Sequence, residues 1–385
     1  MPGTYSQRLL HAVTSRATRH STEKASPDAT ALTHADRHRR KAHRFQFAGV
    51  RGMLQAEPIA LGTGNPMPAA RQSKEMPPLI PHGTELMKGF KRQRIKTSGA
   101  EIEVAIAGKG PPLLLIHGNP LSLVSWHKVA PSLAQSFTVV ATDLRGYGDS
   151  SKPEGGGDHS DYSFRAMALD NVEVMDKLGF ENFAVAGHDR GARVAFRMCL
   201  DHPQRVARMV SLDIVPTHHL LTNLSVGWGS ESYHWFFLAQ KAPYPETLIC
   251  RDLDYYIKYK LNKRGVGLDI FSKEAMAEYV RCTTPEQIHS VCEDYRATLT
   301  VDFEMDKADY GRKQIACPVL HLWGSNSHVG RNFQPIHAWA PWCRDVRGWA
   351  VPTGHYPAEH RPDLIYPTFW QFFSGMEPEP YTGPH

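Results

Sequence analysis

Short apolar runs alternate with helix-like patterns along most of this chain, and this alternation restricts its fold more than any other feature. The runs that predict buried strands are 113–117, 138–143, 183–187, 206–214, 318–324 and 345–350. The helical patterns that separate or follow them are 163–179, 190–200 and 363–373. Residues 92–107 predict a further pair of antiparallel strands. This order predicts an α/β fold with a mostly parallel sheet covered by helices on both faces.

The alternation stops at residues 217–305, which are rich in Tyr, Trp, His and charged residues and contain no clear strand. We interpret this segment as a helical cap inserted after the strand that ends at Asp213. A cap over the carboxyl edge of a parallel sheet would enclose a pocket. The predicted organisation is therefore a core at 87–216 and 306–385, with the cap between its two parts.

Residues 1–86 lack apolar periodicity, and we expect them to be a disordered extension. They contain 12 Lys and Arg against 6 Asp and Glu, whereas the rest of the chain contains 32 against 33. The body is therefore nearly neutral, which gives no reason to expect a nucleic acid as partner.

Two interpretations of the extension compete. The first twenty residues hold Arg8, Arg16 and Arg19 and no acidic residue, which is typical of a mitochondrial transit peptide. Alternatively, the folded protein begins at Met87 and the upstream residues are dispensable. We favour the second interpretation because a patterned segment opens at Phe90.

The cysteines and the apolar runs indicate where such a chain works. None of the six cysteines forms a C-x-x-C pair or stands at zinc-ligand spacing from histidines, so we expect no metal site and a reduced, cytoplasmic setting. No apolar run approaches the roughly 20 residues that cross a bilayer, and no secretory segment is visible. No glycine-rich loop suited to a phosphate is present, and we expect no cofactor.

A five-residue motif between the predicted strand 183–187 and the helix 190–200 carries the candidate chemistry. It reads Gly187-His188-Asp189-Arg190-Gly191. Small residues flank the centre because the turn is tight and the helix packs closely on the strand. This is the position and spacing of the nucleophile elbow of the α/β-hydrolase fold, with Asp189 where a serine usually stands. The alternative is an aspartate that only caps the helix.

An aspartate at this position indicates a particular reaction. A carboxylate is ionised at neutral pH and needs no base to activate it. It can displace a leaving group at saturated carbon and form an alkyl ester, which water then hydrolyses at the aspartate's own carbonyl. The motif therefore predicts displacement at carbon–halogen bonds or at epoxide carbon–oxygen bonds.

The second step needs a base and a group that orients it. His355 follows the last predicted strand and precedes the closing helix, the usual position of the catalytic histidine in this fold. With 21 histidines in the chain, an ordinary surface or core histidine is the alternative. The usual place for the acid, after the strand 318–324, holds no carboxylate. Asp213 is therefore the candidate, the alternative being a strand-end residue that bonds a backbone amide.

The segment His117-Gly118-Asn119-Pro120 ends an early predicted strand. In this fold the amide after His-Gly and the amide after the nucleophile form an oxyanion hole, which here gives the N–H groups of Asn119 and Arg190. A simple turn is the alternative, because such a segment recurs across this large fold.

These features together resemble the fluoroacetate (haloacetate) dehalogenases of the α/β-hydrolase superfamily, over roughly residues 88–373. The segments that carry the resemblance are TDLRGYGDSSKP (142–153), YSFRAMALD (162–170), GHDRGARVAFRMCLDHP (187–203), LDIVPT (212–217), YHWFFL (233–238), APYPE (242–246), DYRAT (294–298) and CPVL (317–320). Several lie in the predicted cap, where superfamily members usually diverge, so the match is more specific than an elbow alone.

The resemblance implies a role for eight side chains. They are Asp189 as nucleophile, His355 as base, Asp213 as acid, Arg190 and Arg193 as carboxylate-binding arginines, and His234, Trp235 and Tyr295 as halide-binding residues. Two guanidinium groups would hold a substrate carboxylate beside an anionic nucleophile. Without the resemblance, the arginine pair would be interpreted as a salt-bridge element, and His234 and Trp235 as core residues. Imidazole, indole and phenol donors would stabilise the departing halide.

Three departures from the family pattern are present. The family usually has an aromatic residue where Asn119 stands, and the neighbouring haloalkane dehalogenases bind halide with an asparagine there. The family's G-W-G stretch corresponds to Asn262-Lys263-Arg264, which removes an aromatic residue. Ala192 stands where a glycine is common. The first two departures bear on which substrate the protein accepts, whereas none of them changes the expected mechanism.

We therefore expect a hydrolytic dehalogenase that acts on fluoroacetate or a larger halogenated carboxylic acid, without metal or organic cofactor. An epoxide hydrolase is the first alternative, with Tyr295 and more weakly Tyr233 as donors, but the arginine pair favours an anionic substrate. A haloalkane dehalogenase and a non-catalytic ligand-binding protein of the same fold are further alternatives. The sequence leaves open whether the protein is a homodimer.

Overall fold

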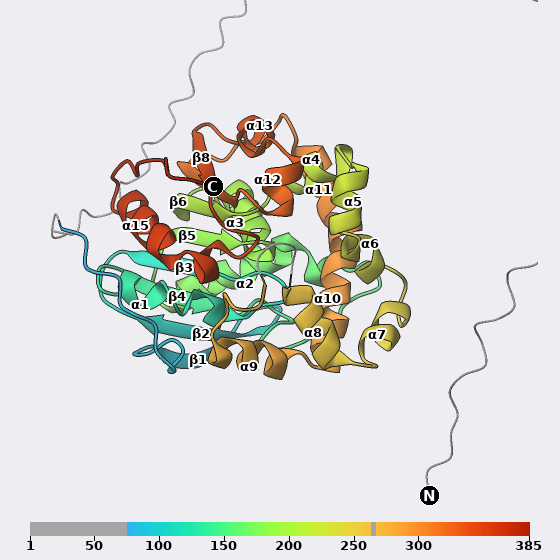
Figure 1. Cartoon of the computed structure of the whole chain (residues 1–385). Helices are drawn as coiled ribbons and strands as arrows, with labels where there is room; N and C mark the ends of the chain where they lie inside the picture. The colour runs from blue at the N-terminus through green and yellow to red at the C-terminus, as the bar shows by residue number, and fades with distance from the viewer. Residues whose placement is uncertain (1–74, 263–266) are drawn as a thin grey trace, which may run out of the picture. The chain divides into compact units, whose positions relative to one another are not determined.

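The computed structural model describes residues 75–262 and 267–385, and within them eight strands form one sheet (Figure 1). The strands are β1 (Lys91–Lys96), β2 (Glu101–Ala107), β3 (Pro112–Ile116), β4 (Thr138–Thr142), β5 (Phe183–His188), β6 (Val206–Leu212), β7 (Val319–Gly324) and β8 (Val346–Val351). Their order is β1-β2-β4-β3-β5-β6-β7-β8. Strand β2 is antiparallel to both neighbours and every other pairing is parallel. The prediction of a mostly parallel sheet is confirmed.

Helices cover both faces of the sheet because the parallel strands are apolar on both sides. In β5, Ala184 and Ala186 belong to the apolar cluster under α1 (Ala130–Leu133) and α15 (Pro362–Phe373). The alternate residue Val185 belongs to the opposite cluster, which the next two helices cover.

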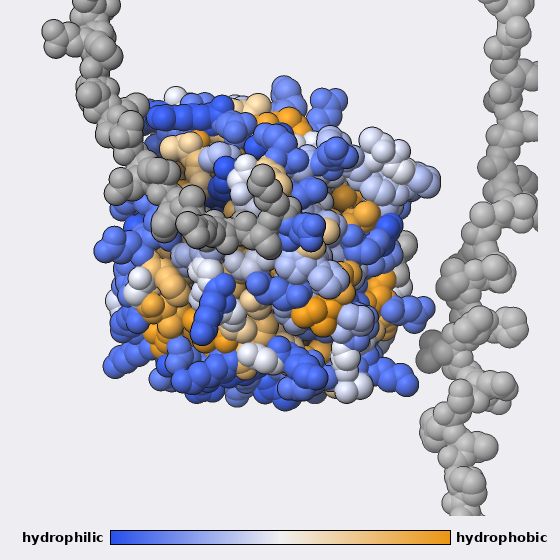
Figure 2. Space-filling model, turned by 90° about the vertical axis from the view of Figure 1, so that its left-hand side faces the viewer, coloured by the Kyte–Doolittle hydropathy of each residue, from blue (hydrophilic) through white to orange (hydrophobic). Residues whose placement is uncertain are grey.

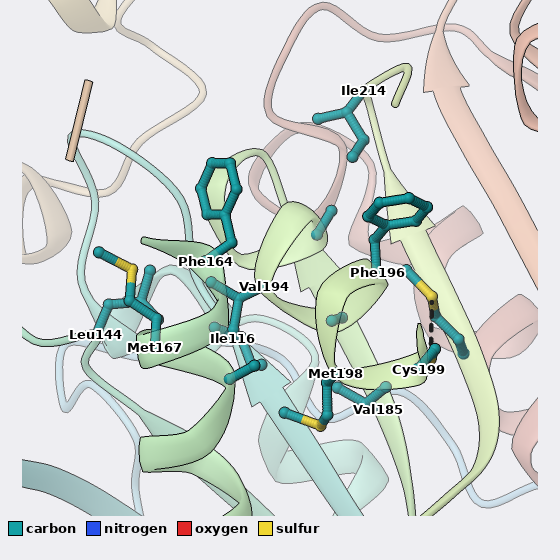
Figure 3. Packing of buried hydrophobic residues seen from close by; sticks show 14 of the residues in the cluster. Ile116, Leu144, Phe164, Met167, Val185, Val194, Phe196, Met198, Cys199 and Ile214 are labelled. Atoms are coloured by element: carbon teal, nitrogen blue, oxygen red, sulfur yellow. Dashed lines mark hydrogen bonds between the residues drawn. The ribbon is translucent and has the colours of Figure 1, made fainter. Parts of the chain in front are cut away.

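These two helices are α2 (Phe164–Lys177) and α3 (Arg190–Asp201). Figure 3 shows their layer, in which Val194 and Met198 of α3 point toward Ile116 and Val185 of the strands. Both helices lie close to their predicted bounds.

Helix α2 illustrates how local sequence sets the ends of an element. The Ser163 side chain caps its start by accepting from the Ala166 amide at 3.2 Å. Gly179 follows its end with φ +83°, a conformation that favours glycine because it has no side chain.

The segment between β6 and β7 is helical, as predicted, and lies on the right of Figure 1. Its helices are α4 (Thr217–Thr222), α5 (Val226–Glu231), α6 (His234–Leu238), α7 (Tyr244–Ile249), α8 (Leu253–Leu261), α9 (Lys273–Cys282), α10 (Pro285–Ala297) and α11 (Phe303–Asp309). A π-helical turn at Thr298–Asp302 joins α10 to α11 in one run. The helical segment therefore ends at Asp309 rather than at residue 305.

The folded body begins upstream of the predicted start at Met87. Backbone groups of residues 77–80 hydrogen-bond to it, through Tyr366 Oη to Pro77 O at 2.7 Å, Gln135 Nε2 to Pro78 O at 3.0 Å, and Ile80 N to Ser132 Oγ at 2.8 Å. Leu79 and Leu86 pack against the apolar cluster under α15. The predicted boundary at residue 86 is therefore wrong for residues 77–86, because they attach through backbone groups that leave no periodic pattern.

Residues 1–74, which hold the transit-peptide pattern and most of the predicted extension, lie outside the described residues. Within the described ranges, all six cysteines are free thiols and no helix is long and apolar enough to cross a membrane. Figure 2 shows one face of the molecule, where hydrophobic residues form separate patches between hydrophilic ones.

Deleting residues 75–86 is expected to destabilise the fold, because it removes these hydrogen bonds and exposes the apolar surface under Leu79 and Leu86. A chain that starts at Met87 should have a free energy of unfolding about 2–4 kcal/mol lower than a chain that starts at Glu75. Urea unfolding of the two chains measures the difference. Equal stabilities would contradict the assignment of this segment to the body.

His321 of β7 is fully buried, and its environment keeps it neutral in the folded protein. Burial lowers the pKa of His321 to about 4, and its Nδ1 lies 3.2 Å from Ser211 O. An unfolded histidine takes up a proton near pH 6.5. The unfolded chain therefore binds this proton first as the pH falls, which reduces the stability of the folded state between about pH 6.5 and pH 4.

The stability difference between the wild type and a His321→Gln variant should consequently depend on pH. Any advantage of the wild type near pH 7 should shrink by up to roughly 3 kcal/mol as the pH falls to about 4, because only the wild type carries this titrating ring. Urea unfolding of both proteins across that range is the measurement. A difference that stays constant or grows toward low pH would mean that the folded protein protonates His321 readily.

Candidate active site

Strand β5 and helix α3 meet at Asp189 in a tight turn. Asp189 has φ +50° and ψ −114°, a region that residues with a side chain rarely adopt. A Cβ on Gly187 would lie 2.3 Å from Gly191 O, and a Cβ on Gly191 would lie 2.3 Å from Ile116 O. Glycine at both positions therefore lets α3 pack directly on β3 and β5, which explains the small residues of the motif.

The strand order places this turn at an opening in the sheet edge. Strands β3 and β5 are neighbours, yet the chain leaves β3 toward β4 on the other side, so the carboxyl ends of β3 and β5 form a topological switch point. The Asn119 amide follows β3 and donates to Asp189 Oδ1 at 3.1 Å. One of the two predicted oxyanion-hole amides thus reaches the Asp189 carboxylate, and the other belongs to Arg190, the first residue of α3.

The structure places His355 between the two other predicted members of the triad. Its Nε2 is 3.4 Å from Asp189 Oδ2, and its Nδ1 is 2.6 Å from Asp213 Oδ2. The remaining oxygen of Asp213 accepts from the Gly324 amide at 2.9 Å. The three residues follow the carboxyl ends of β5, β6 and β8. Strands far apart in the sequence therefore place them at the same edge of the sheet.

The surroundings of Asp213 keep this buried carboxyl ionised. Burial alone would raise the pKa of Asp213, but the hydrogen bond from His355 and the electrostatic effects of His355 and His328 outweigh burial and lower it. An ionised Asp213 holds the Nδ1 proton of His355 and leaves Nε2 able to accept a proton. His188 supports the same loop, because its Nε2 lies 2.7 Å from His355 O.

Arg190 is fully buried and bound by Asp294 of α10 through two oxygens. Its Nε donates to Asp294 Oδ2 at 2.9 Å, and its Nη2 donates to Oδ1 and to the Thr298 hydroxyl. Tyr147 also donates to Asp294, at 2.6 Å. Burial alone would lower the pKa of Arg190, but the Asp294 charge more than offsets it and the pKa is raised. Much of this guanidinium therefore serves an ion pair, and the sequence did not predict its partner, Asp294.

Arg193 lies one turn further along α3 and is also buried. Its Nη1 donates to Val215 O at 3.0 Å and to Thr217 Oγ1 at 2.9 Å. Burial lowers the pKa of Arg193 to about 10, which still leaves it charged at neutral pH. Arg190 Nη1 and Arg193 Nε are buried and have no hydrogen-bond partner in the part of the chain that the structure describes.

The three predicted halide-binding side chains meet beside this arginine pair. The Tyr295 ring centroid is 5.7 Å from that of His234 and 5.6 Å from that of Trp235. The Arg190 guanidinium carbon lies 4.2 Å from the Tyr295 centroid, and that of Arg193 lies 4.8 Å from the Trp235 centroid. The structure thus brings the predicted carboxylate-binding and halide-binding groups together.

The Asn119 side chain joins the two sides of the site. Its Nδ2 donates to the Tyr295 hydroxyl at 3.2 Å, so the hydroxyl oxygen acts as acceptor and its own proton stays available to donate. Burial raises the pKa of Tyr295, so the phenol keeps that proton at neutral pH. Asn119 therefore holds the Tyr295 hydroxyl in place, in addition to standing in the turn after β3.

A pocket of about 180 Å³ opens beside these residues, between the cap helices and the core. It reaches the triad at His355 and the predicted halide site at His234. Its walls come from α5, α6 and α8 on the cap side and from residues 326–331 on the core side.

Three residues near the site were not predicted from the sequence. Asp294 directly precedes Tyr295 in the DYRAT segment, and that adjacency was the available signal. Lys260 and His328 line the pocket, and no motif surrounds either of them. The departures at Lys263 and Arg264 lie outside the described residues.

Asp213, His328 and His355 offer three ligand atoms that lie within 4.8 Å of one another, which is close enough to hold a metal ion. The 2.6 Å hydrogen bond between Asp213 and His355 already occupies two of these groups. The arrangement therefore fits an acid–base pair better than a metal centre.

Comparisons with known proteins agree with this fold. Residues 111–360 match the family model of the alpha/beta hydrolase fold. The chain is 44% identical over 280 residues to a fluoroacetate dehalogenase from Burkholderia sp, which covers 72% of this chain and 92% of that protein. It is 34% identical over 285 residues to a soluble epoxide hydrolase from Corynebacterium sp. (strain C12), with 72% and 96% covered.

A comparison with solved structures also finds the α/β-hydrolase fold. The crystal structure of a protein assigned to the α/β hydrolases from Nostoc sp PCC 7120 superposes with a TM-score of 0.73 at 47% identity. The match covers 74% of this chain and 98% of that one.

Proposed function

The chain belongs to the α/β-hydrolase family, and from this premise we propose that it hydrolyses the carbon–halogen bond of small halogenated carboxylic acids. The arginine pair carries the proposal: Arg190 and Arg193 lie buried beside Asp189, and each keeps one N–H group without a partner among the described residues. A buried donor without an acceptor is costly unless a ligand supplies one. A substrate carboxylate supplies it and offsets the repulsion between an anionic substrate and an anionic nucleophile.

In the first step, Asp189 Oδ2 attacks the halogen-bearing carbon. A carbon–oxygen bond forms, and the carbon–halogen bond breaks with its electron pair on the halide. The donors of His234, Trp235 and Tyr295 stabilise the departing halide. The Asn119 amide holds Oδ1, which becomes the carbonyl oxygen of the ester.

In the second step, His355 Nε2 takes a proton from water, whose oxygen attacks the Cγ atom of the Asp189 ester. The Asn119 amide stabilises the negative charge that develops on Oδ1. Asp213 stabilises the imidazolium. The hydroxy acid then leaves with one oxygen of Asp189, water supplies the replacement, and the proton goes to solvent.

An epoxide hydrolase is the second candidate, because an Asp–His–Asp triad also opens epoxides and the Corynebacterium epoxide hydrolase is a relative. That reaction needs two hydroxyl donors above the nucleophile. Tyr295 is buried in the site, whereas Tyr233 is 50% exposed on the pocket wall. A neutral epoxide would also leave the two buried arginine donors unsatisfied, so the haloacid is favoured. The intact triad disfavours a non-catalytic binding protein.

A His355→Asn variant is expected to complete the first step and stop at the ester, because the base for hydrolysis is missing. Mass spectrometry of the intact variant after incubation with chloroacetate should show an adduct, and proteolysis should map it to the peptide that contains Asp189. The wild type, treated identically, should show no lasting adduct. An adduct on another residue, or halide release by the variant without an adduct, would contradict the assignment.

Replacing Arg193 by leucine is expected to lower kcat/KM for a haloacid, because a buried partner of the carboxylate is lost. The corresponding increase in activation free energy should be on the order of 2–4 kcal/mol. A neutral haloalkane of the same size should be almost unaffected. Halide release from both substrates measures the change.

Arg197→Leu is the matched control, because it removes a buried arginine of the same helix that pairs with Asp306 and Asp309 instead. This control should leave the ratio of the two kcat/KM values unchanged. Equal losses for haloacid and haloalkane in Arg193→Leu would assign Arg193 a purely structural role.

A further inference from the structure

Asn119 joins the core to the cap through two different groups. It follows β3, and its backbone amide donates to Asp189 Oδ1 at 3.1 Å. Its side-chain Nδ2 donates to the hydroxyl oxygen of Tyr295, on the cap helix α10, at 3.2 Å. Asn119 is only 2% exposed, so water competes little for either bond. This residue therefore fixes the Asp189 carboxylate and the Tyr295 hydroxyl group relative to each other.

The bond from Asn119 restricts where the Tyr295 proton can point. A phenol oxygen both accepts and donates hydrogen bonds. Because the side-chain N–H group of Asn119 occupies an acceptor position of this oxygen, the phenol proton must point away from Asn119. The hydroxyl group has no other hydrogen bond among residues 75–262 and 267–385. An acceptor for its proton therefore has to come from a ligand or from water.

The neighbours of this hydroxyl group indicate which acceptor fits. The Tyr295 ring centroid is 5.7 Å from that of His234 and 5.6 Å from that of Trp235, and both of these rings carry N–H groups. The Arg190 guanidinium carbon lies 4.2 Å from the Tyr295 centroid. Donors and a positive charge thus lie near the hydroxyl group, which favours an anion as its acceptor.

We propose that Asn119 is a positioning residue for the leaving group: its side-chain amide directs the Tyr295 proton toward the departing halide, and this direction sets how strongly the protein discriminates between halides. The inference rests on the proposed function, because it takes the halide to leave beside Tyr295. Fluoride is the smallest halide and depends most on hydrogen bonds as it departs. Loss of the directed proton should therefore slow carbon–fluorine cleavage more than carbon–bromine cleavage.

The reaction is unchanged by this role, and its two steps make the leaving group measurable by itself. Asp189 Oδ2 displaces the halide, and Tyr295 donates a hydrogen bond to it while keeping its proton. Fluoroacetate and bromoacetate give the same ester on Asp189, so the hydrolysis of that ester is identical for both. Under initial-rate conditions kcat/KM covers the steps up to the loss of halide. The ratio of kcat/KM for the two acids therefore isolates the effect of the leaving group.

The test is the ratio of kcat/KM for fluoroacetate to kcat/KM for bromoacetate, measured by halide release. Asn119→Leu keeps the backbone amide and the approximate size of the side chain but removes its N–H donor. It should lower the ratio by about fivefold or more, part of the effect of one charged hydrogen bond. Tyr295→Phe should lower the ratio as well. Combined with Tyr295→Phe, Asn119→Leu should change the ratio no further, because the proton that Asn119 directs is then absent.

Two further variants complete the test. Asn119→Asp keeps the shape of the side chain but turns the donor into an acceptor, so the Tyr295 proton should point toward it and the ratio should fall as in Asn119→Leu. Its added negative charge acts on the same carboxylate in both substrates and cancels in the ratio. If Asn119→Leu misfolds, Asn119→Asp decides the outcome.

Ser122→Ala is the matched control, because it removes a buried hydroxyl group from the same loop after β3. The Ser122 hydroxyl oxygen has no hydrogen-bond partner in the described part of the chain. This variant should therefore leave the ratio unchanged.

The contradicting results separate the inference from the proposed function. Equal losses for both acids in the Asn119 variants, with the ratio unchanged, would make the side chain purely structural. A ratio that falls equally with and without the Tyr295 hydroxyl group would make Asn119 a direct donor to the halide. Either result would overturn the inference and leave the proposed function standing, whereas the absence of halide release from both acids with the wild type would overturn both.

Discussion

The direct packing of helix α3 on strands β3 and β5 is the constraint on which the site depends. A side chain at Gly187 or Gly191 would separate helix and sheet. With the helix held this close, the chain must turn at Asp189 with φ +50°, which costs about 1–3 kcal/mol and persists because the surrounding core fixes both elements. At the start of α3, the Ala192 and Arg193 amides donate to the backbone carbonyl of Asp189 at 3.1 Å and 3.3 Å, so the first turn of the helix holds this residue in place.

Buried ion pairs between α3 and the cap add a second constraint. Arg190 binds Asp294 of α10, and Arg197 lies 3.4 Å from Asp306 and 2.6 Å from Asp309 of α11. Separating such a pair leaves an uncompensated buried charge, at a cost of roughly 3–5 kcal/mol. Tyr295 follows Asp294 directly, so the ion pair that anchors the cap also positions the Tyr295 ring relative to Asp189.

The sequence predicted the elements and the positions of the three triad candidates because both follow from local patterns. Apolar runs, the Ser163 cap and Gly179 mark element ends, and Asp189, Asp213 and His355 stand at strand ends that a parallel sheet brings to one edge. The ion pair of Arg190 with Asp294 joins residues 104 positions apart and has no local pattern. The attachment of residues 77–80 was missed for a related reason, since backbone groups make their hydrogen bonds and leave no side-chain pattern in the sequence.

The central claim is that Asp189, and not water, attacks the substrate carbon. A single turnover in oxygen-18 water, with enzyme in excess over chloroacetate, tests it most directly, because the first product must take its oxygen from the attacking group. The account predicts unlabelled hydroxy acid and oxygen-18 in the peptide that contains Asp189, measured by mass spectrometry. Label in the hydroxyl group of the first product, with none in Asp189, would show that water attacks the substrate and that Asp189 acts only as a base.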